Sequence, residues 1–180
     1  MAKIIKFVLS LIICEAAAAL GGWFTAPAIA DWYSGINKPS WVPSGGVIGG
    51  VWTVLYILMA IALYLAWDKN FEVKLPDSGK VRKPWNKLSE KLYMGEWRNA
   101  NVVLVFAVQL LLNIAWSAIF FGLRQPGWAF FELLTLWVAI VYTIVNFYRV
   151  TKPAGYILLP YLFWVTFAGY LNYSIWMMNN

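Results

Sequence analysis

Aromatic side chains recur at helical spacing inside long apolar stretches of this chain. Trp52 and Tyr56 are four residues apart, as are Trp164 and Ala168, so the members of each pair share one face of a helix. Flat rings on such a face can stack on a flat aromatic ligand, which contributes about 0.5–1.5 kcal/mol per ring pair beyond the area buried. These residue types favour a binding site for a flat, apolar molecule, although the same rings can simply pack helix against helix.

Polar groups accompany the rings. Asn113, Trp116 and Ser117 share a helix face at i, i+3 and i+4, and Asn172 follows Ala168 at i+4. Amide, hydroxyl and indole N–H groups can hold the polar edge of a ligand. The same groups commonly form hydrogen bonds between membrane helices, so the sequence leaves both roles open.

Other chemistry is excluded by composition. The chain has no histidine and one cysteine, Cys14, which removes the usual general base, the commonest zinc ligand and any internal disulfide. We expect no metal site, no cofactor and no acid–base catalysis. If a reaction occurs, Trp52 and Trp164 are the candidates for catalysis, through oxidation of the indole. Glu15 and Glu132 are acids inside apolar segments, where ionisation is costly, and neither is assigned a catalytic role.

Composition also indicates where the chain resides. Of its 180 residues 62% are hydrophobic and 12% charged, with mean hydropathy +0.64, whereas soluble domains carry about 25% charged residues. A membrane crossing needs about 20 apolar residues. The sequence therefore predicts an all-α, multi-pass integral membrane protein: a single domain over residues 1–180, built as a bundle of five transmembrane helices. The predicted helices are 4–25, 47–67, 101–122, 127–148 and 155–176, with a polar loop at 68–99.

Lysine and arginine predict the orientation. With five spans, the N-terminus and the second and fourth loops share one side and hold twelve of these residues, against Lys38 and Arg124 on the other side. The positive-inside rule places the N-terminus in the cytoplasm and the C-terminus outside. The net charge of +6 is then a property of the cytoplasmic loops and does not indicate a nucleic acid partner.

The predicted depth in the membrane is similar for many of the aromatic residues. At 1.5 Å per residue they lie about 8 to 18 Å below the outer ends of their helices. These residues are Trp52, Tyr56, Asn113, Trp116, Trp137, Trp164 and Ala168. Above them, residues 32–52 hold three tryptophans, a tyrosine, two prolines and five glycines. We interpret this stretch as the lid of an apolar pocket; the alternative is an aromatic belt at the membrane interface.

Short motifs throughout the chain carry a family resemblance. With these motifs the chain resembles the tryptophan-rich sensory protein family, also called the translocator or peripheral benzodiazepine receptor family (TspO/MBR). The motifs are Trp32-Tyr33, Lys38-Pro39-Ser40-Trp41-Val42-Pro43, Val51-Trp52-Thr53-Val54-Leu55-Tyr56, Asn113-Ile114-Ala115-Trp116-Ser117, Phe120-Phe121-Gly122, Leu136-Trp137, Pro160-Tyr161-Leu162-Phe163-Trp164, Phe167-Ala168 and Leu171-Asn172.

The resemblance implies five membrane helices, a homodimer, and a pocket beneath the first loop that accepts porphyrins, sterol-like lipids and synthetic aromatic drugs. Together with the depth argument it gives the expected ligand-binding set and three expected partners: a porphyrin or other apolar small molecule, membrane lipid, and a second copy of the chain. The expected ligand-binding residues are Trp32, Tyr33, Trp41, Pro43, Trp52, Tyr56, Asn113, Trp116, Ser117, Trp137, Trp164, Ala168 and Asn172.

Some features depart from the family pattern. Ser44 and Gly50 stand where prolines are common, and the sterol motif proposed for the last helix lacks a basic residue after Tyr170 or Tyr173. Sterol is therefore not the preferred ligand; a match at residues 145–152 is weak. In the long second loop, residues 84–93 read either as a helix lying in the membrane interface or as a flexible linker.

Three functions fit these features. The first is a membrane receptor or sensor that binds tetrapyrroles in the pocket. The second is an enzyme that degrades porphyrin in light by means of pocket tryptophans. The third is a transporter, which has less support because the middle of each span lacks lysine and arginine.

The charge split yields a topology prediction. In the variant Asn180→Cys, with Cys14 replaced, a membrane-impermeant thiol reagent should label intact cells, because the C-terminus is expected outside. Labelling that appears after lysis and not before would contradict the predicted orientation.

Overall fold

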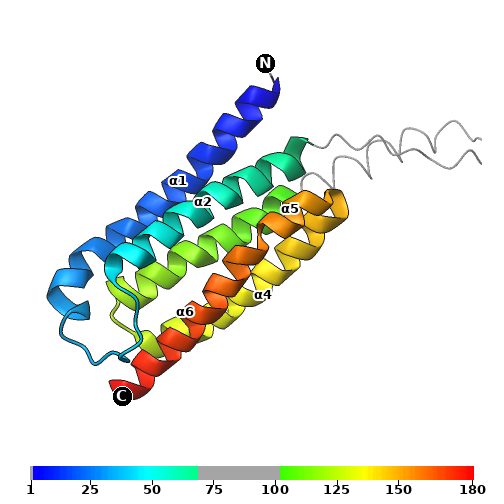
Figure 1. The fold of residues 1–180 in the computed structure, drawn as a ribbon. Helices are drawn as coiled ribbons and strands as arrows, with labels where there is room; N and C mark the ends of the chain where they lie inside the picture. The colour runs from blue at the N-terminus through cyan, green and yellow to red at the C-terminus, as the bar shows by residue number, and fades with distance from the viewer. Residues whose placement is uncertain (1, 69–101) are drawn as a thin grey trace, which may run out of the picture.

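The computed structural model of the chain describes residues 2–68 and 102–180. Among these residues, five helices are long and apolar enough to cross a membrane. They run side by side as one bundle, with the two termini at opposite ends (Figure 1). The predicted five-helix membrane bundle is thus confirmed. The spans are Lys3–Tyr33, Gly45–Asp68, Val102–Gly122, Pro126–Val150 and Lys152–Met178.

The first span is longer than the sequence predicts. Helix α1 (Ala2–Ala28) contains Pro27 and continues as a π-helix, η1 (Ile29–Tyr33), so the helical segment ends at Tyr33 and not at residue 25. Proline removes one helix hydrogen bond and crowds the preceding turn, and a wider π turn follows it in this chain. Trp32 and Tyr33 therefore lie on helix, and the first loop shortens to residues 34–44.

Helix α2 (Gly45–Asp68) packs along α1, as Figure 1 shows. Several fully buried residues of these helices are small: Ala60, Ala62 and Ala66 on α2, and Cys14 on α1. In a bilayer such close contacts replace the hydrophobic effect as the main source of helix association. At the end of the pair that holds the N-terminus, Lys6 Nζ lies 3.6 Å from an oxygen of Asp68 and donates to the carbonyl of Trp67.

The third span ends in a π-helix, η2 (Ala118–Gly122), and a short turn leads to α4 (Pro126–Val150). Arg124 in this turn has φ 56°, a left-handed conformation that closes the connection. Pro126 stands in the first turn of α4, where a missing N–H costs no hydrogen bond.

The fifth span consists of two helices where the sequence predicts one. Helix α5 (Lys152–Ile157) is separated from α6 (Leu159–Met178) by Leu158, and Pro160 stands in the first turn of α6. A proline at this position has no N–H to donate to the preceding turn, which explains the break. The two helices still form one continuous span across the bundle.

Most of the second loop lies outside the described residues, and so does the predicted interfacial helix at residues 84–93. The two interpretations of residues 84–93, an interfacial helix and a flexible linker, therefore both stay open.

Helix α5 packs so closely on the end of α4 that its position 155 requires glycine. A Cβ on Gly155 would lie 2.7 Å from Tyr148 Cβ and 2.9 Å from Tyr148 Cα. Gly155→Ala should lower the free energy of unfolding by about 1–3 kcal/mol, because backbone must shift to admit the methyl group. Thermal unfolding in detergent measures the effect. Gly46→Ala is the control, because a Cβ on Gly46 meets nothing within 4 Å; equal losses in both variants would contradict the packing argument.

Candidate functional site

A cavity of about 470 Å³ lies inside the bundle, beneath the end that holds the first loop. Its wall comes from α1, η1, α2, the third span and α6. Its volume is within the range of about 300–1,000 Å³ that is usual for small-molecule sites. Aromatic rings make up much of the wall: Tyr33, Trp52, Tyr56, Trp116, Phe120, Phe121, Trp164 and Phe167.

Most of the residues predicted for ligand binding meet at this cavity. The structure brings nine of them to its wall from four different spans. Four others, Trp32, Trp41, Pro43 and Trp137, do not line it. The nine residues are Tyr33, Trp52, Tyr56, Asn113, Trp116, Ser117, Trp164, Ala168 and Asn172.

The remaining tryptophans occupy other positions. The Trp32 ring packs edge-on against Phe120, 5.6 Å between centroids, and so lies behind the cavity wall. Trp41 stacks on Tyr170 at 5.1 Å, in the loop above the cavity. Trp137 is partly exposed on α4, and its Nε1 donates to Thr166 Oγ1 at 2.9 Å. Its depth is that of the cavity residues, but no residue of α4 lines the cavity.

Sequence reasoning missed several lining residues. Phe120 follows Trp116 at i+4 and stacks on it at 5.2 Å, and Phe167 follows Trp164 at i+3 with ring centroids 5.3 Å apart. The helical spacing that singled out the tryptophans could have identified both phenylalanines. Gly21 is a different case, because it lines the cavity without a side chain. A Cβ at this position would lie 3.3 Å from Ser117 Oγ.

A buried hydrogen-bond network forms one part of the wall. Tyr56 Oη donates to Asn113 Oδ1 at 2.6 Å, and Asn113 Nδ2 donates to Tyr161 Oη at 2.8 Å. The three side chains come from α2, the third span and α6, so the network joins three helices. Asn113 therefore has the helix-linking role that the sequence left open.

Asn172 makes a second link. It accepts a hydrogen bond from Trp116 Nε1 at 3.0 Å and donates to the carbonyl of Pro126 at 2.7 Å. Trp116 is thereby fixed in orientation. Trp164 differs, because its buried Nε1 has no hydrogen-bond partner among the residues that the structure describes. This donor is itself buried, so a bound molecule can use it only if the indole turns toward the cavity.

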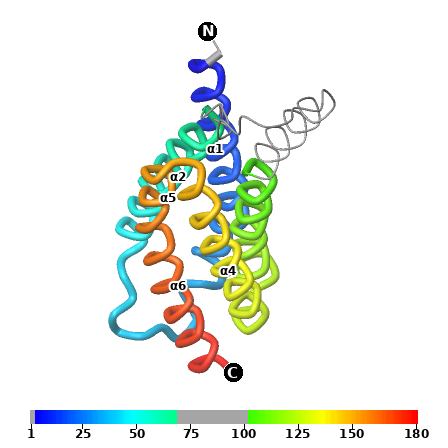
Figure 2. The backbone as a smooth tube through the Cα atoms, turned by 90° about the vertical axis from the view of Figure 1, so that its right-hand side faces the viewer, coloured from blue at the N-terminus to red at the C-terminus, as the bar shows by residue number. Residues whose placement is uncertain are grey.

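The first loop covers the cavity as a lid, which we define as residues 34–44. Figure 2 shows it crossing from α1 to the C-terminal end of α6 before it enters α2. Asn37 N–H donates to Asn179 Oδ1, and Asn179 Nδ2 donates to the Asn37 carbonyl, each at 2.9 Å. Lys38 Nζ donates to the carbonyls of Tyr33, Ser34 and Ile36. These bonds hold the lid to α6 and to the end of η1.

The fold and the cavity define a class: a multi-pass membrane protein with an aromatic-walled cavity inside its helix bundle. A sequence profile of the TspO/MBR family matches residues 10–177. The chain therefore belongs to the TspO/MBR family.

Three related proteins are similar in sequence to this chain over most of its length. The chain is 35% identical to the tryptophan-rich protein TspO of Archaeoglobus fulgidus over 98% of its own length and 99% of that protein. It is 37% identical to the tryptophan-rich protein TspO of Chlorobaculum tepidum, over 98% of each chain. It is also 39% identical to the human translocator protein, over 83% of this chain and 75% of that one.

The buried network generates a stability prediction. Asn113→Ala leaves the hydroxyls of Tyr56 and Tyr161 without this partner, which should cost about 1–3 kcal/mol of unfolding free energy. Tyr56→Phe removes one donor and keeps the ring, so its loss should be smaller. Chemical denaturation in detergent compares the two variants. A loss in Tyr56→Phe as large as that in Asn113→Ala would show that the amide does not connect the two phenols.

Proposed function

We propose that this protein is a membrane receptor or sensor that binds porphyrins and similar flat, apolar molecules in the cavity under the lid. The observation that carries the proposal is the continuous aromatic wall. The Trp52 ring lies 5.8 Å from that of Tyr56, Trp116 stacks on Phe120, and Trp164 lies 5.3 Å from Phe167. Rings at these separations offer stacking surfaces to a flat ligand.

The polar groups of the wall suit the edge of such a ligand. Trp164 Nε1 is a donor without a partner, whereas the amides of Asn113 and Asn172 are engaged between helices. The Nε1 atom is buried, so a carboxylate or carbonyl on a bound molecule accepts from this indole only once the ring turns toward the cavity. With this donor the cavity would match a ligand in the position of its polar group as well as in its shape.

Membership of the TspO/MBR family supports a membrane sensor or translocator role, because one relative is named a translocator protein and another a tryptophan-rich sensory protein. The particular ligand is the part that we propose. The homodimer implied by the family resemblance stays a prediction.

Volume provides the direct test. Ala168 lines the cavity, so Ala168→Phe should exclude protoporphyrin by filling space and weaken binding by at least about tenfold, or 1.4 kcal/mol. Quenching of tryptophan fluorescence in darkness measures the affinity. Ala19→Phe is the control, because Ala19 is exposed on α1 and does not line the cavity. Unchanged affinity in Ala168→Phe would place porphyrin binding elsewhere.

An experiment under illumination distinguishes porphyrin binding from porphyrin degradation. Trp52→Phe and Trp164→Phe keep an aromatic face but remove the more easily oxidised indole. A receptor should therefore lose little affinity in Trp52→Phe, and in Trp164→Phe at most the one hydrogen bond of the indole, about 0.5–1.5 kcal/mol. Loss of the porphyrin absorbance band on illumination, if it depends on the parent protein and stops in both variants, would favour the light-dependent enzyme over the receptor.

A further inference from the structure

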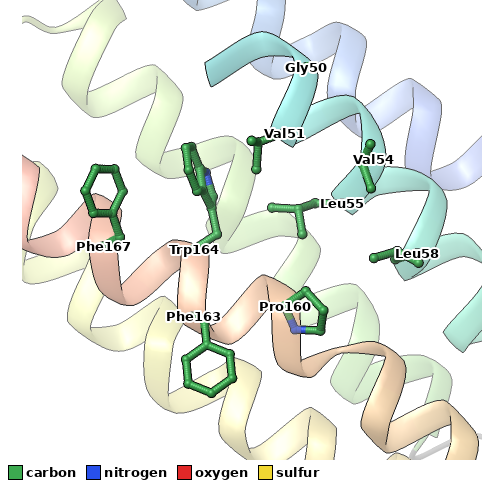
Figure 3. Close-up of a pocket in the computed structure, with 9 residues that line it drawn as sticks. All are labelled: Gly50, Val51, Val54, Leu55, Leu58, Pro160, Phe163, Trp164 and Phe167. Atoms are coloured by element: carbon green, nitrogen blue, oxygen red, sulfur yellow. The ribbon is translucent and has the colours of Figure 1, made fainter. Parts of the chain in front are cut away.

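A groove runs between α2 and α6 on the side of the bundle, close to the cavity (Figure 3). In Figure 3, side chains of α2 face side chains of α6 across an open space. The lining is apolar on both sides. It consists of Gly50, Val51, Val54, Leu55, Leu58, Pro160, Phe163, Trp164 and Phe167.

The groove opens toward lipid. Phe163 is 71% exposed and Val54 is 55% exposed, and they form the outer rim. From the start of α2, the groove extends from Gly50, about 8 Å deep, to Leu58, about 20 Å deep. These depths lie within the roughly 30 Å hydrocarbon core, so the groove meets acyl chains and not water.

Groove and cavity share a wall. Trp164 and Phe167 line both spaces. Of two neighbouring glycines, Gly49 lines the cavity and Gly50 lines the groove. Helix α2 packs closely on α1 and α5 but makes no comparably close backbone contact with α6. Side chains, and not backbone, therefore separate the cavity from the bilayer along this seam.

Of the two side chains that separate groove and cavity, Trp164 packs on Phe167 at 5.3 Å between ring centroids, and Phe167 packs in turn on Trp41 of the lid at 5.8 Å. No hydrogen bond among the described residues fixes the Trp164 ring. Trp116 and Trp137 are held by hydrogen bonds to Asn172 and Thr166, whereas Trp164 Nε1 has no such bond. A rotation of the Trp164 ring between staggered positions therefore breaks no hydrogen bond. On the opposite side of the seam, glycine leaves open space, because a Cβ on Gly49 or Gly50 meets nothing within 4 Å.

The route through the lid is closed by several contacts. Asn37 and Asn179 exchange hydrogen bonds, and Trp41 stacks on Tyr170 at 5.1 Å. Opening the lid would break all of these contacts together.

We propose that apolar ligands pass between the bilayer and the cavity sideways, through the α2–α6 groove, with Trp164 and Phe167 as the movable partition. The inference rests on the proposed function, because it concerns how a ligand reaches that same cavity. It identifies the ligand class as flat, apolar molecules that are dissolved in the membrane.

Three neighbouring glycines provide the test, with protoporphyrin as the probe and the full chain in lipid nanodiscs. Gly50→Leu fills the groove, Gly49→Leu fills the cavity, and Gly46→Leu does neither. None of the three leucines introduces a clash at its Cβ, and leucine suits a helix better than glycine. Stopped-flow tryptophan quenching gives the association and dissociation rates of each variant.

The expected results differ by variant. Gly50→Leu should slow association and dissociation alike, each by about tenfold, and leave the dissociation constant within about twofold, because a narrowed route alters both directions equally. Val54→Trp, a second groove-filling variant, should act in the same way. Gly49→Leu should raise the dissociation constant, and Gly46→Leu should match the parent.

A lid variant completes the design. Asn179→Ala removes two hydrogen bonds between the lid and α6 and should leave both rates unchanged. The lateral route is overturned if Asn179→Ala accelerates both rates, or if Gly50→Leu and Val54→Trp bind and release porphyrin as fast as the parent. A parent protein that binds no protoporphyrin would overturn the proposed function, and this inference with it, which is a distinct outcome.

Discussion

Within a bilayer, burial of apolar surface does not drive helices together, since lipid tails are as apolar as leucine side chains. Close packing of small residues and hydrogen bonds between helices must supply the specificity instead. In this protein the amide of Asn113 joins Tyr56 on α2 to Tyr161 on α6. The three helices that meet there also enclose the cavity. The shape of the cavity thus depends on a polar contact in an otherwise apolar interior.

The same constraint divides the tryptophans into two groups. Trp116 and Trp137 have hydrogen-bond partners that fix the plane of the ring. Trp164 has none among the described residues and stands between the cavity and the groove. A buried donor without a partner is costly. The cost of this unpaired Trp164 N–H favours binding of a ligand that offers it a hydrogen-bond acceptor.

The sequence predicted the five spans because hydropathy and length determine them almost completely. It also predicted which side chains share the depth of the cavity, from helical rise alone. Rise does not show which helices enclose a cavity, and for that reason Trp137 on α4 was grouped with residues that it does not join. The helix ends at Tyr33 and at Leu158 were missed because they depend on how the chain accommodates Pro27 and Pro160. The bonds between Asn37 and Asn179 join residues 142 positions apart, which no local pattern reveals.

The position of Cys14 has a practical consequence. Its thiol is fully buried where α1 packs on α2, and it is the single cysteine of the chain. A thiol-reactive dye therefore reaches it when these two helices separate and not before. The rate at which the dye reacts, measured against denaturant or temperature, reports the opening of the α1–α2 pair as a local event distinct from global unfolding. The native chain thus contains its own chemical probe of helix association in the membrane.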